Sequence, residues 1–168
     1  MEPVSWQRAR QRLPSLLPFA AIGSTCIVAG GLVAAVTAPL ELAHGSWMAA
    51  YLVLALGVAQ VALGAGQSLL ARHPPSPAVV ALEVAGWNLG GATVVAGTLT
   101  GTPVLTTVAG TVLLATLLLF IRAAARGSGE AREPGPGARA ARWLYLAVLV
   151  ILAVSVPVGM LLAWRRHG

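Results

Sequence analysis

Lysine and aspartate are absent from this chain of 168 residues, and cysteine occurs once, as Cys26. A single cysteine excludes an internal disulfide, and the lack of Asp leaves no Ser–His–Asp triad. Only 10% of the residues are charged, against roughly 25% in soluble domains. Since 57% are hydrophobic, the composition excludes an ordinary soluble protein and indicates one membrane-integrated domain.

All the basic residues are Arg, and with five Glu they leave a net charge of +6. A positive charge is typical of nucleic-acid-binding proteins, but no stripe of basic and aromatic side chains accompanies it here. Arginines in loops beside an anionic membrane surface account for the charge. We therefore expect the lipid bilayer as a partner and no nucleic acid.

Long apolar stretches take up most of the chain, and about 20 residues suffice to cross the hydrocarbon core as a helix. The uncharged stretch from Val84 to Ile121 is too long for one crossing, and its polar part, Thr98–Pro103, predicts a turn. The sequence therefore predicts an all-α bundle of five transmembrane helices, at about 17–38, 46–70, 78–99, 104–121 and 143–164.

Proline and glycine indicate where these helices begin and end. Pro14 and Pro18 are expected at the entrance of the first helix, where a missing N–H costs little. The run from His73 to Pro77 is expected to form a rigid turn. Segment 122–142, rich in Gly and Pro at its centre, is expected to be a flexible cytoplasmic loop.

The distribution of arginine predicts the orientation of the bundle. Most of the arginines precede the first predicted helix or lie in or beside the second and fourth loops: Arg8, Arg10, Arg12, Arg72, Arg122, Arg126, Arg132, Arg139 and Arg142. Cytoplasmic loops carry the excess of Arg in membrane proteins. We therefore predict a multi-pass protein of the cell membrane, with its N-terminus inside and its C-terminus outside.

Glu83 is the ionisable residue that lies well inside a predicted span. A charged, unpaired carboxylate is costly there, so such a residue is a candidate functional site. Three interpretations stay open: a partly solvated carboxyl that is neutral or paired with Arg72, a proton relay or ion site, and a hydrogen bond between helices.

Other polar residues share the membrane with Glu83. Gln60 and Gln67 are seven positions apart and lie on one helix face. Because a short turn makes the second and third spans antiparallel, we predict that Gln60 faces Glu83; otherwise each glutamine bonds elsewhere. Asn88 is predicted to bond a neighbouring helix, with contact to a ligand as the alternative.

His44 stands at the predicted outer start of the second span, ahead of Gly57, Gln60 and Gly64. The region from His44 to Gly66, together with Trp87–Gly90, resembles haem–copper oxidase subunit I and related small bacterial membrane proteins. In that group a His at this place binds haem, so the resemblance implies haem as a cofactor held by His44. The family's copper-site histidines have no counterpart here, and oxidase activity is therefore not expected. A histidine at the membrane interface without a ligand is the alternative.

No metal-ligand spacing and no nucleophile–base pattern occurs, so we predict neither a catalytic residue nor a metal site. The leading hypothesis is a non-catalytic accessory or scaffold component of a membrane complex, packed against other subunits or its own copies. One alternative is a haem-binding or redox-sensing protein that uses His44. Another is a small oligomeric transporter or proton-coupled carrier that uses Glu83.

Overall fold

The computed structural model describes residues 4–70, 75–126 and 136–167, and within them regular structure is helical. Its side chains are described within 12–161, outside 71–74, 125–136 and 138. Five segments are long and apolar enough to cross a membrane: Arg12–Thr37, Gly45–Leu70, Pro77–Leu99, Pro103–Ala124 and Arg139–Leu161. The predictions of an all-α fold and of five candidate spans are confirmed.

The first helix, α1, covers Val4–Thr37 and contains Pro14 and Pro18. The prediction that it begins near residue 17, with both prolines at its entrance, was wrong. Proline removes one helical hydrogen bond, but neighbouring groups often compensate for this in membrane helices. Here the Arg12 guanidinium donates to the carbonyl oxygens of Ser68 and Leu69, at 2.7 and 2.8 Å, and holds this part of α1 against the second span.

The second span is one continuous rod made of three segments: α2 (Gly45–Ala50), the π-helical segment η1 (Tyr51–Ala59) and α3 (Gln60–Leu70). The sequence predicted its bounds closely but not the π-helix. A π-helix has backbone hydrogen bonds between residues i and i+5. Such helices are rare in proteins, and those that occur are often found at functional sites. The unusual segment lies in the half of the span that begins at His44.

The third and fourth spans form an antiparallel hairpin of α4 (Pro77–Leu99) and α5 (Pro103–Arg126). Ser76 caps α4, because its hydroxyl accepts the backbone N–H of Val79 at 3.4 Å. The predicted turn at Thr98–Pro103 is confirmed, and Gly101 takes the left-handed φ of 62° that this turn needs.

The last helix, α6, covers Pro136–His167. The predicted loop 122–142 is therefore helical at both ends, and its remaining centre lies outside the described residues. The prediction was wrong at the ends because alanine and arginine predominate there, and both have high helix propensity.

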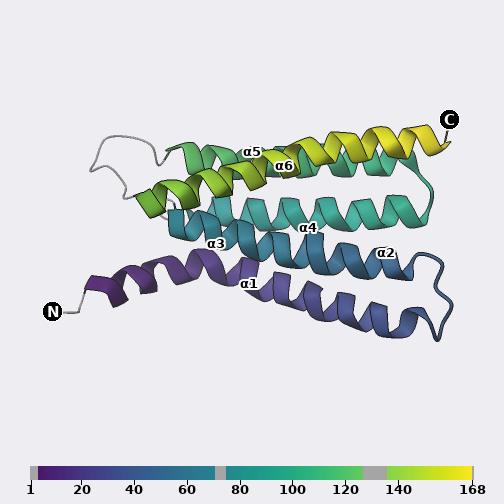
Figure 1. Ribbon diagram of the computed structural model, residues 1–168, viewed down its shortest axis with the longest axis horizontal. Helices are drawn as coiled ribbons and strands as arrows, with labels where there is room; N and C mark the ends of the chain where they lie inside the picture. Colours follow the sequence, from purple (N-terminus) through teal and green to yellow (C-terminus); the bar gives the residue numbers. More distant parts are fainter. Residues whose placement is uncertain (1–3, 71–74, 127–135, 168) are drawn as a thin grey trace.

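The helices run roughly side by side, and the two termini lie at opposite ends of the bundle (Figure 1). Helix α1 packs along the whole second span, α4 packs on α5, and α6 packs on α5 and α3. We call the end that holds Arg12, Arg122, Arg139 and Arg142 the arginine end. We call the opposite end, with His44 and the α4–α5 turn, the histidine end.

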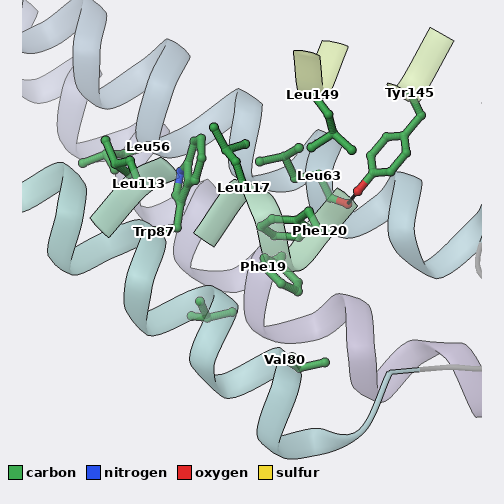
Figure 2. Close-up of a cluster of buried hydrophobic side chains, with 11 residues drawn as sticks. Phe19, Leu56, Leu63, Val80, Trp87, Leu113, Leu117, Phe120, Tyr145 and Leu149 are labelled. Carbon is green, nitrogen blue, oxygen red and sulfur yellow. Dashed lines mark hydrogen bonds between the residues drawn. The ribbon is translucent and has the colours of Figure 1, made fainter. Parts of the chain in front are cut away.

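An apolar core of buried side chains joins the helices (Figure 2). Its fully buried members are Phe19, Leu63, Leu117, Phe120 and Leu149. The rings of Phe19 and Phe120 lie 5.7 Å apart between centroids and link α1 to α5. Large apolar side chains are also exposed on every span, as expected for surfaces that face lipid.

Glycines allow the backbones to approach closely at several helix contacts. A side chain at Gly64 would collide with Phe19, one at Gly91 with Leu56, and one at Gly66 with the ring of Tyr145. Small residues at helix contacts are the usual means of packing helices in membranes. These glycines therefore set how tightly the second span is held by α1, α4 and α6.

Replacing Gly64 by Ala should destabilise the protein. The added Cβ meets Phe19, which is fully buried and has no room to move. Over-packing of this kind costs about 1–3 kcal/mol. Gly31→Ala in α1 is the matched control, because nothing lies within 4 Å of its added Cβ, and alanine favours the helix by up to about 1 kcal/mol. Thermal unfolding in detergent should show a lower midpoint for G64A alone; equal midpoints would contradict this packing.

Candidate functional site

Glu83 lies in α4 and is completely buried. Its Oε1 accepts a hydrogen bond from Gln67 Nε2 at 3.0 Å, whereas its Oε2 has no partner among the described residues. The carboxyl is therefore shielded from bulk solvent, contrary to the prediction of partial solvation, and the hydrogen bond between helices is present. A neutral carboxyl stays a prediction. Arg72, the other proposed partner, lies outside the described residues.

Gln60 is also buried, and neither Nε2 nor Oε1 of its amide has a partner among the described residues. The prediction that Gln60 faces Glu83 was wrong, because Gln67 takes that place two helical turns nearer the arginine end. In an antiparallel hairpin, distance from the connecting turn decides which residues are level, and Gln67 lies close to the end of α3 at Leu70.

Asn88 makes its hydrogen bond within α4, where Nδ2 donates to the carbonyl oxygen of Val84 at 2.8 Å. The prediction of a bond to a neighbouring helix was therefore wrong. The adjacent Trp87 makes that bond instead, since its Nε1 donates to the carbonyl oxygen of Ala55 in η1 at 3.1 Å. A buried tryptophan usually needs a hydrogen-bond partner for its indole N–H. The presence of Trp87 in the third span could therefore have indicated that Trp87, and not Asn88, bonds a neighbouring helix.

Tyr145 ties α6 to the second span in a similar way. Its hydroxyl donates to the carbonyl oxygen of Leu63 at 3.2 Å, and its ring packs against Gly66. Figure 2 shows Tyr145 and Leu149 reaching from α6 towards Leu63 and Phe120. Helix α6 is thus held against α3 in the arginine-end half of the bundle.

A cavity of about 1090 Å³ lies between the second span, α4, α5 and α6 in the other half. Its inner walls are mostly apolar and include Leu56, Trp87, Leu113, Leu117 and Val156. Four of these side chains, Leu56, Trp87, Leu113 and Leu117, are seen together in Figure 2. Pockets for small molecules are typically roughly 300–1,000 Å³ and mainly apolar, so the cavity is large enough for a sizeable ligand.

The cavity reaches the surface at the histidine end, and its rim is more polar than its walls. His44 and Trp47 stand there as exposed side chains, and the ring of Trp47 stacks on Tyr51 at 5.3 Å between centroids. Hydroxyl groups come from the α4–α5 turn, from the start of α5 and from α6: Thr98, Thr100, Thr102, Thr106 and Ser155. The opening is therefore suited to a ligand with a polar head.

The cavity exists because α6 packs on α3 in one half of the bundle but lines open space in the other. Tyr145 and Leu149 are buried, whereas Leu152, Gly159 and Met160 line the cavity. Glycine at position 159 leaves room that a side chain would fill, since nothing lies within 4 Å of an added Cβ. Sequence reasoning missed the cavity, because it depends on the separation of helices that are distant in the chain.

The four residues singled out from the sequence thus fall in two places. His44 lines the cavity, whereas Gln60 and Glu83 are buried beside it and Asn88 is half-buried in α4. Among the described residues, His, Cys, Asp and Glu do not gather in groups of three or more that suit a metal ion. The structure therefore offers two candidate sites, the cavity and the buried polar cluster.

Comparison with known proteins adds no relative: no protein-family model, no curated protein and no solved structure matches this chain.

Proposed function

We propose that this protein is a non-catalytic membrane protein that binds a lipid-soluble molecule in the cavity at the histidine end. The observation that carries the proposal is the cavity itself, with its volume of about 1090 Å³ and its apolar walls. An open volume of this size would otherwise have to hold water against apolar side chains, which is unfavourable. A bound apolar molecule removes that cost.

The lining favours an amphipathic ligand with a long apolar body. The body contacts Trp87, Leu113 and Leu117 deep in the cavity, and the head meets the threonine hydroxyls and His44 at the rim. An acyl-chain lipid or an isoprenoid with a hydroxyl or carbonyl head has this chemistry. Holding such a molecule suits an accessory component of a membrane complex, the role that the composition and the short loops favour.

The proposed orientation places the N-terminus and the arginine end in the cytoplasm, and the C-terminus and the mouth of the cavity outside. It rests on the positive-inside rule and on the sequence, in which nine of the eleven arginines precede the first span or flank the second and fourth connections, against Arg165 and Arg166 after the last span. The ligand would then enter from the outer half of the cell membrane.

Filling the cavity should abolish ligand binding without unfolding the protein. Gly159→Phe adds a large side chain at a position that lines the cavity, where nothing lies within 4 Å of an added Cβ. Gly31→Phe is the matched control, since Gly31 is an equally open helical glycine in α1 that does not line the cavity. Native mass spectrometry of protein extracted from membranes should show a bound apolar molecule on the wild type and on G31F, but not on G159F. Equal adducts on both variants, or none on the wild type, would refute the proposal.

Fusions to alkaline phosphatase, which is active only outside the cytoplasm, test the orientation. A fusion after Thr100, in the α4–α5 turn, should be active, and a fusion after Arg126, at the end of α5, should be inactive. The two fusion sites lie at opposite ends of the same helix. A difference in phosphatase activity between the two fusions therefore reports which end of that helix is outside the cytoplasm. The reverse pattern would show that the N-terminus is outside.

Haem is a second candidate ligand for the same cavity, favoured by one observation: His44 and Met160 both line it. Imidazole and thioether are together an axial ligand pair of known haem proteins. The donor types therefore match, with His44 as the ligand that the sequence resemblance implies and Met160 as the second. Bound haem would supply one-electron redox chemistry, and the apolar walls would exclude water from it.

An absorption spectrum of purified protein, expressed with added haem, distinguishes the two candidates. Haem binding predicts a Soret band that shifts on reduction, disappears in His44→Ala, and persists in His73→Ala, the control histidine of the α3–α4 connection. Met160→Leu should alter the reduced spectrum because it removes the second ligand. A featureless spectrum of folded protein would exclude haem and leave the lipid-soluble ligand as the occupant.

A further inference from the structure

The buried polar cluster of Gln60, Gln67 and Glu83 contains three side-chain atoms without a partner among the described residues. They are Nε2 and Oε1 of Gln60 and Oε2 of Glu83, and all three residues are at most 2% exposed. Buried polar atoms without a hydrogen bond cost about 1–3 kcal/mol each. These atoms therefore call for partners other than the side chains that the structure describes.

Polar groups on the helices packed around the cluster are already engaged with backbone carbonyls. Arg12 of α1 bonds the carbonyls of Ser68 and Leu69, and Tyr145 of α6 bonds that of Leu63. Trp87 of α4 bonds the carbonyl of Ala55, and Thr116 of α5 bonds that of Val112. Tyr145 also lies near enough to Glu83 for the two groups to interact electrostatically.

The protonation state of Glu83 follows from this environment. An ionised carboxylate only accepts hydrogen bonds, and here a single amide donates to it, which leaves a charge that is poorly compensated in an apolar setting. A protonated carboxyl has one acceptor and one donor. The acceptor is matched by Gln67, and the hydroxyl is free to donate to a further partner.

Water is the partner that fits both free groups. Gln60 lies seven positions from Gln67, about 10 Å along the helix axis, so it and Glu83 are offset by two turns. Buried water molecules typically make about three hydrogen bonds to polar groups that would otherwise be unsatisfied. A short row of them would span this offset and bond the amide at one end and the carboxyl at the other.

We propose that Gln60, Gln67 and Glu83 form an internal proton-binding site, completed by buried water that joins the Glu83 carboxyl to the Gln60 amide. The proton passes between water and the carboxyl: a hydronium ion gives it to the carboxylate and leaves as water, and the reverse step releases it. Ala59, next to Gln60, and Trp87, one turn from Glu83, both line the cavity. Water and protons would reach the site from the cavity when no ligand fills it, which gives Glu83 a role beyond ligand binding.

Infrared spectroscopy of the protein in nanodiscs at neutral pH tests this site. A protonated carboxyl gives a carbonyl stretching band that is separate from those of amides and carboxylates. We expect this band in the wild type, its loss in Glu83→Gln, and its retention in Glu41→Gln, because Glu41 is an exposed carboxyl at the histidine end. Absence of a Glu83-dependent band would overturn the proposal.

Two further measurements test the water itself. Transfer of the wild type to heavy water should lower the frequency of the band within minutes, which needs no variant and holds even if E83Q fails to fold. Gln60→Met keeps the side-chain size but removes both polar atoms, so it should shift the Glu83 band if water joins the two residues. A band that neither exchanges in heavy water nor moves in Q60M would show a dry, isolated carboxyl and refute the site.

Discussion

Hydrocarbon offers no hydrogen-bond partners, so each polar group inside the bundle must find one within the protein or in trapped water. This constraint explains why the chain forms helices and why its buried tryptophan and tyrosine donate to backbone carbonyls. Trp87 and Tyr145 bond Ala55 and Leu63 and so attach α4 and α6 to the second span. Those two bonds, with the glycines at the same contacts, fix how α4 and α6 lie against the second span.

The second span is consequently the centre of the molecule. Its arginine-end half is held by α1, α4 and α6 through Arg12, Gln67 and the contact of Tyr145 with Gly66. Its other half contains the π-helical segment and forms one wall of the cavity. Both halves pack against α1, and the histidine-end half also accepts the Trp87 bond at Ala55, but only that half faces the cavity. That asymmetry places a rigid polar cluster directly beside a volume that is suited to a ligand.

The two candidate sites rest on different physics. The cavity is lined by apolar side chains that no other described side chain covers. The polar cluster contains buried hydrogen-bonding atoms that have no partner among the described residues. They adjoin at Trp87, whose ring lines the cavity and which lies one turn from Glu83. Occupation of the cavity by an apolar molecule would change how much water reaches Glu83. Ligand binding and protonation are therefore expected to influence each other through this shared boundary.

Hydropathy by itself determined the fold class, the five spans and the Thr98–Pro103 turn, because the cost of burying charge in lipid depends on residue type alone. It also singled out His44, Gln60 and Glu83 as polar residues in unusual places. Only the tertiary structure decided that Gln67 is the partner of Glu83, that Asn88 bonds its own helix, and that α6 leaves a cavity in front of His44. Register and separation depend on which side chains interlock between helices. Glycine contacts such as that of Gly66 with Tyr145 set how the side chains interlock. The composition and periodicity of one helix do not show which residues of another helix it will meet.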